Sequence, residues 1–317
     1  MFTVNLRFCR FLRSTVVGVW LTLGAPLWVA AETWRFALIG DTPYSDYERN
    51  ELPKMLQAIA DYGAEFVVHV GDIKHSKDRC DDALFTDRLA VFSASRIPLV
   101  LVPGDNEWSD CDRLNSGGYQ PQERLNTLRR LFWSRPDALG QKRLPLQRQA
   151  APWLEHSRFR IGPVLFVTLN LPGGNNHWGL AEQPSPEFSE RNPQVLAWLR
   201  DSFALARRER LAGIALLFQA NPEFKSHAQG LSHAGYREFL DLLRDETQRF
   251  PGRVLAVHGD THTSRIDQPL RDVQGKIIKN FTRVETHGYP FMGWTLGVID
   301  SDDPQLWRFT PHRWPSP

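Results

Sequence analysis

The sequence predicts an α/β fold in which parallel strands alternate with helices. Between residues 33 and 105, apolar runs of strand length alternate with stretches whose apolar residues recur at helical spacing. The apolar runs are nearly continuous, which is typical of strands buried on both faces. With 317 residues, 42% of them hydrophobic and 11% aromatic, the chain is large enough to bury a sizeable core.

The first half of the chain carries three predicted strands and three predicted helices. The first helix has Leu52, Met55 and Ile59 on one face. The polar stretch 136–152 lacks such periodicity and is expected at the surface. The predicted strands are 34–39, 66–70 and 98–102, and the predicted helices are 48–62, 82–95 and 122–132.

The second half continues the alternation. Residues 159–171 predict paired strands that turn at Gly162 and Pro163, and the loop 172–186 is rich in glycine, asparagine and proline. No flexible linker separates the halves, so we expect residues 32–317 to form a single domain. The further predicted strands are 214–218, 254–257, 276–284, 294–299 and 306–309, and the further helices are 193–210 and 236–248.

Residues 1–31 predict a cleavable export signal. Three arginines precede an apolar run from residue 15 to residue 30, and Val29-Ala30-Ala31 is a small-residue cleavage pattern. An uncleaved anchor is the alternative, but the run is shorter than the roughly 20 residues of a membrane span and contains two glycines and a proline. We expect a mature chain that begins at Glu32, is periplasmic or secreted, and keeps no stable membrane anchor.

The charge of the mature chain argues against a polyanion-binding surface. The whole sequence has 38 basic and 36 acidic residues, and the signal removes three arginines and no acid. The mature chain is therefore close to neutral and has no basic run that would indicate nucleic-acid binding.

Cys80 and Cys111 are the two cysteines left once Cys9 departs with the signal. An even pair in an exported protein predicts a disulfide. Two free thiols are the alternative if the protein stays in a reducing compartment.

Four aspartates directly follow glycine at the ends of four predicted strands. Ligands of α/β sheets bind beyond the carboxyl ends of the strands, so we expect the four carboxylates along one rim. One such aspartate is more often a turn residue or a helix cap, but four in the same position indicate a common role. The four residues are Asp41, Asp72, Asp105 and Asp260.

Carboxylates gathered in this way predict a metal centre. Bound cations, shared protons or basic partners are the usual remedies for their mutual repulsion. The four negative charges match two divalent ions. His262 lies two residues after Asp260 on the same predicted turn and is a further candidate ligand.

The order of these motifs resembles that of the calcineurin-like metallophosphoesterases. Four segments and the helix-like stretch 197–207 are similar to blocks of that family, over nearly the whole mature chain. The resemblance implies a four-layer αββα sandwich and hydrolysis of a monoester or diester of a small molecule or a macromolecule. The four segments are GDTPYSD at Asp41, GDIKHS at Asp72, PGDNEW at Asp105 and HGDTH at 258–262.

Several positions depart from the family pattern. Asn106 replaces the histidine that the family uses on the substrate, whereas His262 keeps a family histidine. The site is therefore richer in carboxylate than the family usually builds. The other departures are Pro43, Ala220 and Asp260 in place of histidines and Asp105 in place of an asparagine.

The resemblance implies two metal ions that share Asp72. Gln219 or Asn221 would add an amide oxygen. Because carboxylates and carbonyls are hard ligands, the set favours Mn²⁺, Mg²⁺ or Ca²⁺ over Zn²⁺. One ion would be held by Asp41, Asp72 and His262, and the other by Asp72, Asp105 and Asp260.

The implied mechanism is attack of a metal-bridging hydroxide on phosphorus, with Asn106, His262 and Asp72 as catalytic residues. Asn106 keeps a hydrogen-bond donor but supplies no proton to the leaving group. Arg265 is a candidate for holding a phosphate oxygen, and Glu107 for supporting the ligands. The candidate acids are His75, His227 and His233, although such histidines are more often ordinary surface residues.

Two alternatives to a hydrolase stay open. A catalytically silent metal-binding domain that recognises a phosphorylated or acidic ligand would explain Asn106 and the missing histidines. A Ca²⁺-stabilised structural domain would show metal-dependent stability without phosphate affinity. Aromatic residues near the rim would either stack on a base or sugar or simply pack, and these are Tyr44, Tyr47, Trp108, Trp178 and Tyr289.

Overall fold

The computed structural model of the protein describes residues 1–3, 32–179 and 183–315. The predicted signal peptide lies almost wholly outside the described residues. Ala31–Pro317 clusters as one compact unit. Within the described ranges, no helix combines the length and apolar character that crossing a membrane requires.

The first sheet contains the predicted strands of the first half. Its strands run in the order β12-β11-β1-β2-β3. Strands β1, β2 and β3 are parallel to one another, whereas β11 is antiparallel to both of its neighbours, β1 and β12. Every residue of β2 and β3 is buried, as the continuous apolar runs predict. The bounds are Thr33–Ile39 for β1, Phe66–His69 for β2, Leu99–Leu101 for β3, Gly293–Asp300 for β11 and Trp307–Arg313 for β12.

The second sheet has the order β4-β5-β6-β7-β8-β10-β9. The predicted paired strands are β5 and β6, which turn at Gly162, and β6, β7, β8 and β10 are parallel. The bounds are Gln147–Arg148 for β4, Ser157–Ile161 for β5, Val164–Thr168 for β6, Gly213–Leu217 for β7, Arg253–His258 for β8, Arg265–Asp267 for β9 and Phe281–Glu285 for β10.

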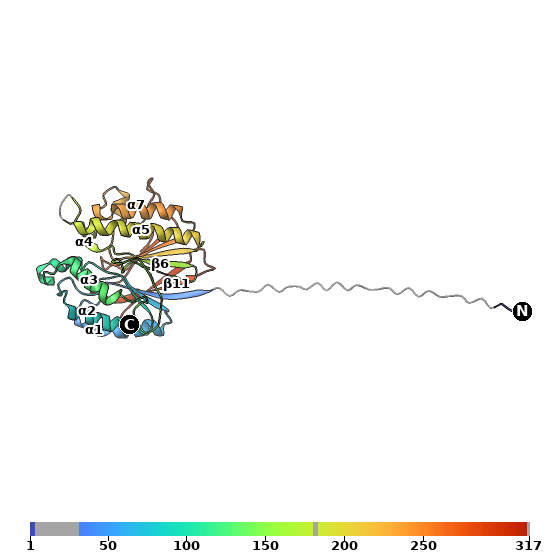
Figure 1. Cartoon of the computed structure of the whole chain (residues 1–317), viewed down its shortest axis with the longest axis horizontal. Helices are drawn as coiled ribbons and strands as arrows, with labels where there is room; N and C mark the ends of the chain where they lie inside the picture. The colour runs from blue at the N-terminus through green and yellow to red at the C-terminus, as the bar shows by residue number, and fades with distance from the viewer. Residues whose placement is uncertain (4–31, 180–182, 316–317) are drawn as a thin grey trace. The chain divides into compact units, whose positions relative to one another are not determined.

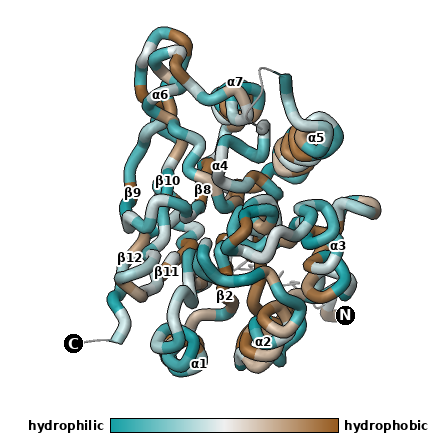
Figure 2. Tube along the Cα trace, turned by 90° about the vertical axis from the view of Figure 1, so that its left-hand side faces the viewer, coloured by the Kyte–Doolittle hydropathy of each residue, from teal (hydrophilic) through white to brown (hydrophobic). Residues whose placement is uncertain are grey.

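Helices cover the outer face of each sheet, so the predicted four-layer αββα sandwich is confirmed. In Figure 1, α5 and α7 lie on one side of the strands and α1, α2 and α3 on the other, and Figure 2 shows the same layers from another side. The bounds are Asp46–Asp61 for α1, Asp82–Ser93 for α2, Pro121–Phe132 for α3, Gly173–Asn176 for α4, Pro186–Arg208 for α5, Phe224–Ala228 for α6 and Ala234–Arg249 for α7.

An aromatic core joins the two sheets. Phe36 of β1 and Phe66 of β2 meet Phe166 of β6 edge to face, with ring centroids 5.3 and 5.2 Å apart. Such pairs are the favoured geometry for buried aromatic rings. These contacts pack β1 and β2 of the first sheet against β6 of the second.

Some elements differ from their predicted bounds. Helix α5 begins at Pro186, seven residues before the predicted start, because the Ser185 hydroxyl caps it by accepting from the Phe188 amide at 3.1 Å. Pro193 therefore lies inside the helix. Strand β10 is shorter than the predicted strand 276–284, because the backbone turns where the Asp272 amide donates to the Lys276 carbonyl at 2.9 Å.

Candidate metal centre

The four Gly-Asp aspartates come together where the ends of the two sheets meet. Asp41, Asp72 and Asp105 follow β1, β2 and β3 of the first sheet, whereas Asp260 follows β8 of the second. The backbone amide of Asp260 donates to both carboxylate oxygens of Asp41, at 3.0 and 3.2 Å. The prediction of a single rim is therefore wrong in detail: the fourth aspartate arrives from the opposite sheet.

Glycines leave the room that the carboxylates occupy. A Cβ on Gly104 would lie 2.1 Å from Asp72 Oδ1. A Cβ on Gly173 would lie 2.5 Å from Asp105 Oδ2 and 3.0 Å from Asp260 Oδ1, so these two oxygens border the same small space. A side chain at either position would displace the carboxylates, because real contacts of this kind are longer. Gly173 was not singled out by the sequence.

Asp72 lies at the centre of a hydrogen-bond network. Its Oδ2 accepts from the Tyr44 hydroxyl at 2.8 Å and from Asn106 Nδ2 at 2.9 Å. The Asn106 backbone amide donates to Oδ1 at 3.2 Å, and Gln219 Nε2 lies 3.3 Å from Oδ2. Tyr44, Asn106 and Gln219 come from three different segments, so Asp72 fixes their relative positions.

Burial dominates the electrostatics of the centre. Desolvation, with the neighbouring carboxylates, raises the pKa of Asp41 and of Asp72 well above the usual value. Desolvation, followed by the charges of Asp110 and Asp260, raises the pKa of Asp105 to about 7. Burial also raises the pKa of Asp260. The charged forms of these groups therefore need a compensating positive charge.

The donor set fits divalent cations, although the side chains are farther apart than the ligands of a complete metal site. Within the described ranges, no three histidine, cysteine, aspartate or glutamate side chains are close enough to form a complete metal site. In the same ranges, the one ion pair of the four aspartates joins Asp41 Oδ1 to His262 Nε2 at 3.6 Å, and no lysine or arginine pairs with them. Buried carboxylates without basic partners are the chemistry that a hard cation stabilises.

A backbone carbonyl fixes the orientation of the His262 ring. Its Nδ1 lies 2.7 Å from the Tyr289 carbonyl oxygen, which only accepts hydrogen bonds. The hydrogen of the neutral ring is therefore on Nδ1, and the lone pair on Nε2 faces Asp41. A backbone carbonyl that fixes the tautomer in this way is typical of histidines that bind metal ions.

The expected amide oxygen ligand is not present in this arrangement. Gln219 Oε1 accepts from the Gly173 amide at 2.5 Å, so it is the amide nitrogen that faces Asp72. Asn221 Oδ1 accepts from the Glu223 amide at 3.3 Å, and only the Asn221 backbone amide reaches Asp260 Oδ2, at 2.7 Å. Gln219 and Asn221 are therefore hydrogen-bond donors to the carboxylates in this arrangement, and an amide oxygen ligand stays a prediction.

Glu107 ties two of the aspartate loops together. Its buried carboxylate accepts from the backbone amides of Asp72 at 3.1 Å, Ile73 at 3.3 Å and Gly104 at 2.6 Å. These bonds fix the segment after β2 against the segment after β3. Glu107 contacts backbone amides, so it supports the ligands rather than facing the centre.

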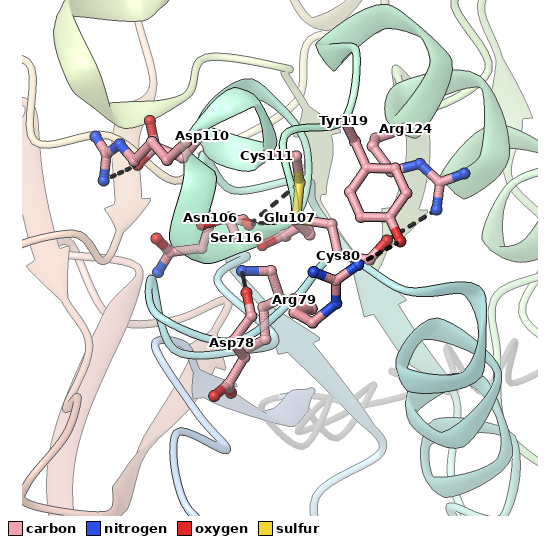
Figure 3. The surroundings of a disulfide bond; sticks show 12 residues. Asp78, Arg79, Cys80, Asn106, Glu107, Asp110, Cys111, Ser116, Tyr119 and Arg124 are labelled. Atoms are coloured by element: carbon pink, nitrogen blue, oxygen red, sulfur yellow. Dashed lines mark hydrogen bonds and ion pairs between the residues drawn. A yellow bond between two sulfur atoms is a disulfide. The ribbon is translucent and has the colours of Figure 1, made fainter.

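The predicted disulfide between Cys80 and Cys111 is confirmed, with Cα atoms 5.9 Å apart. Figure 3 shows the bond beside Asn106, whose carbonyl oxygen lies 3.5 Å from the sulfur of Cys80 and 3.6 Å from that of Cys111. Both cysteines are fully buried. The disulfide therefore supports the residue that stands in the position of the family's substrate histidine.

A model of one protein family matches the stretch of the chain that contains all four aspartates. Residues 35–264 match the family described as calcineurin-like phosphoesterase. The chain belongs to the calcineurin-like phosphoesterases. Membership implies divalent metal ions and supports a phosphoester hydrolase in general. No curated protein matches the chain.

Two solved structures illustrate the fold of the family. A dimetal phosphatase from Danio rerio is 14% identical with a TM-score of 0.52, over 88% of this chain and 98% of that one. A purple acid phosphatase from yellow lupin (Lupinus luteus) seeds is 14% identical with a TM-score of 0.51, over 90% of this chain and 52% of that one. The chain thus spans about half of the lupin protein. At such identities the likeness shows the fold alone.

Among the candidate acids of this calcineurin-like site, His75 borders the centre. Its ring meets the Tyr44 ring edge to face, with centroids 5.4 Å apart. His227 instead lies 3.4 Å from Asp241, and the exposed His233 precedes α7. The structure therefore leaves only His75 of the three near the aspartates.

Arg265 is already engaged by a buried carboxylate. Its Nε lies 2.8 Å from Glu285 Oε2, and its Nη2 donates to the Thr261 hydroxyl at 3.1 Å. Glu285 is fully buried, so this pair is costly to separate. The prediction that Arg265 holds a phosphate oxygen therefore has no support in the contacts of this side chain.

Proposed function

We propose that the protein is a metallophosphoesterase whose two divalent cations are held by a carboxylate-rich set of ligands. The observation that carries the proposal is the convergence of four aspartates, two of them buried and two partly buried, that no lysine or arginine of the described residues neutralises. The proposed ligands are Asp41, Asp72, Asp105, Asp260 and His262.

Each part of the set has a definite task in this proposal. Bound cations would supply an activated water nucleophile and neutralise charge on the phosphoryl group. Asp72, which is held by Tyr44 and Asn106, would be the ligand that the two cations share. Asn106 Nδ2 lies 2.9 Å from Asp72 Oδ2 and would orient a phosphoryl oxygen by exchanging one of its two hydrogen bonds, to Asp72 or to Tyr44.

The ligand types favour Mn²⁺, Mg²⁺ or Ca²⁺ over Zn²⁺. Four of the five proposed ligands are carboxylates, which are hard donors, whereas imidazole and thiolate ligands select zinc more strongly. Gln219 and Asn221 donate hydrogen bonds to the carboxylates, which favours the ionised, ligating form and opposes the effect of burial.

A hydrolysis assay tests the proposal. Purified protein is stripped with chelator, and hydrolysis of p-nitrophenyl phosphate and bis-p-nitrophenyl phosphate is followed as Mn²⁺, Mg²⁺, Ca²⁺ or Zn²⁺ is restored. We expect turnover that depends on the metal, is highest with Mn²⁺ or Mg²⁺, and is lost in Asp72→Ala. The ester that reacts faster identifies a monoesterase or a diesterase. Equal metal affinities and rates with Zn²⁺ and Mn²⁺ would contradict the proposed ligand chemistry.

A silent binding domain is the second candidate, because Asn106 supplies no proton and its amide nitrogen is already bonded to Tyr44 and Asp72. In that case metal and inorganic phosphate would bind without turnover of either ester. Metal-dependent stability without phosphate affinity would instead indicate a structural Ca²⁺ site.

We further propose that residues 32–317 are the mature domain, exported to the periplasm or medium. The buried disulfide supports an oxidising compartment. Amino-terminal sequencing of the exported protein would then begin at Glu32, whereas a chain retained with Met1 would contradict the proposal.

A further inference from the structure

Three large aromatic side chains are exposed together beside the candidate centre. Tyr47 is 58% exposed, Tyr289 is 40% exposed and Phe291 is 60% exposed. All three line one groove of about 220 Å³, whose wall also includes Met292 and Trp314. Contiguous exposed apolar surface of this kind usually marks a place where something binds.

The groove is joined to the centre by the loop that carries Tyr289. The Tyr289 amide donates to the Asp41 carbonyl at 3.3 Å, and the Tyr289 carbonyl accepts from His262 Nδ1 at 2.7 Å. A Cβ on the preceding Gly288 would lie 2.8 Å from Asp41 Cβ and 2.9 Å from His262 Cδ2. The backbone of the loop is thus packed directly against two proposed metal ligands, and its side chains point into the groove.

The aromatic surface also continues inward from the groove. The ring of Tyr289 is stacked on that of Tyr44, with centroids 6.1 Å apart and an angle of 29°. The Tyr44 hydroxyl in turn reaches Asp72. A ring placed in the groove would therefore lie on the same aromatic wall that ends at the proposed metal ligands.

The size and chemistry of the groove fit a single ring system. Pockets for drug-sized ligands are about 300–1,000 Å³, so a groove of about 220 Å³ suits a smaller group. The guanidinium of Arg313 lies 5.6 Å from the centre of the Phe291 ring, which adds a planar cation to the aromatic wall. Aromatic faces and guanidinium planes both favour a flat π system.

We propose that this groove binds the leaving group of the substrate and selects phosphoesters whose leaving group carries an aromatic ring. The inference rests on the proposed hydrolase and adds its substrate class. An aryl group and a nucleobase share the required chemistry. In both, the phosphoryl group lies at the aspartates while the ring stacks on Tyr289 and Phe291.

Binding of two phosphonates tests the groove without requiring turnover. Benzylphosphonate carries a ring and propylphosphonate does not, and neither has a hydrolysable ester bond. Calorimetric titration of the Mn²⁺-loaded protein is expected to show at least tenfold tighter binding of benzylphosphonate, as stacking of one ring on aromatic side chains typically gives. Phe291→Ala and Tyr289→Leu should reduce this ratio to about two or less.

Tyr62→Ala is the matched control. Tyr62 is an equally exposed tyrosine, at 50%, beyond the other end of α1, roughly 22 Å from Tyr47 along the helix axis. The ratio of the two affinities should be unchanged in this variant. Equal affinity for both phosphonates in the native protein, or an undiminished ratio in Phe291→Ala, would overturn the inference and indicate that the patch serves another partner.

Kinetic measurements then distinguish an aryl leaving group from a nucleobase, and they test the aromatic groove separately from the proposed hydrolase. The values of kcat/KM for phenyl phosphate, adenosine 5′-monophosphate and glycerol 3-phosphate show whether an aryl group or a nucleobase is preferred. Tight binding of benzylphosphonate without turnover of any ester would support ring binding in the groove and contradict the proposed hydrolase activity. Turnover of all three esters at equal kcat/KM would support the proposed hydrolase and contradict selection of an aromatic leaving group by the groove.

Discussion

The Tyr44 hydroxyl donates to Asp72 Oδ2 at 2.8 Å and accepts from Asn106 Nδ2 at 2.9 Å. One phenol thus connects the central carboxylate with the residue that replaces the family's substrate histidine. Burial raises the pKa of Tyr44 well above its usual value, so the phenol stays protonated and serves as a donor.

Tyr44→Phe should therefore weaken catalysis more than folding. The change removes one hydrogen bond to a buried carboxylate, and such a bond to a charged group is worth roughly 1.5–3 kcal/mol. We expect kcat/KM for p-nitrophenyl phosphate to fall about tenfold to a hundredfold at a temperature where the variant is folded, whereas the unfolding midpoint falls by several degrees only. Tyr62→Phe, an exposed control, should keep full activity. Unchanged kcat/KM in Tyr44→Phe would show that the network has no role in turnover.

Gly173→Ala should disable the centre without changing its charge. The added methyl group would meet Asp105 Oδ2 at 2.5 Å and Asp260 Oδ1 at 3.0 Å, so the carboxylates would have to move. We expect loss of Mn²⁺ binding by at least tenfold, measured by calorimetry.

Gly118→Ala is the contrasting variant for that experiment. Its Cβ would meet nothing within 4 Å, but its φ of +68° strains an alanine. Gly118→Ala should lower stability by about 1 kcal/mol and leave Mn²⁺ affinity intact. Equal Mn²⁺ affinity in Gly173→Ala and the native protein would rule out the space beside Gly173 as part of the centre.

Replacing both Cys80 and Cys111 by serine should destabilise the protein. The bond closes a loop with a sequence separation of 31, for which the chain-entropy relation gives about 3 to 4 kcal/mol. Denaturant unfolding in oxidising buffer measures the loss. Because the sulfurs contact the Asn106 carbonyl, turnover should also be reduced at denaturant concentrations too low to unfold the variant. A variant with native stability would contradict the structural role of the bond.

The buried His156 should lower the free energy of unfolding in mild acid. Burial lowers its pKa from 6.5 to about 4, so below pH 6.5 the unfolded chain takes up a proton that the folded protein does not. Stability is therefore complete above pH 6.5 and decreases as the pH falls toward 4. Between pH 7.5 and 5 this group should cost about 2 kcal/mol.

The contribution of His156 is isolated by comparing variants. His156→Asn should lose less stability than the native protein over the same pH interval, measured by denaturant unfolding. His233→Asn, at an exposed position, should follow the native curve. Parallel curves for all three proteins would contradict the assignment to His156.

Most of the fold follows from patterns that are local in the sequence. The apolar spacing of α1 and the continuous apolar runs of β1 to β3 reflect burial that each segment experiences by itself. The start of α5 was missed because Pro193 looks like a first-turn proline, whereas the cap is Ser185. The short α6 and β9 have too few residues to show any period.

The candidate site could be predicted from the sequence only where an aspartate directly follows an apolar strand. The position of Asp260 beside the other aspartates depends on how the two sheets pack against each other. No local sequence pattern encodes this packing. Tyr44 meets Asp72 28 residues later, and Gly173 meets Asp105 and Asp260 only in the folded chain. The orientation of the Gln219 amide likewise depends on the distant Gly173 backbone.

Manganese binding and turnover measured together show whether this protein is a metal-dependent hydrolase. Chelator-treated protein and Asp72→Asn are dialysed against Mn²⁺, and bound metal and hydrolysis of p-nitrophenyl phosphate and bis-p-nitrophenyl phosphate are measured on the same samples. We expect about two Mn²⁺ per native chain with turnover that rises with occupancy, and loss of both in Asp72→Asn. A native protein that binds no Mn²⁺, or whose turnover persists without metal, would rule out the proposed metal-dependent hydrolase.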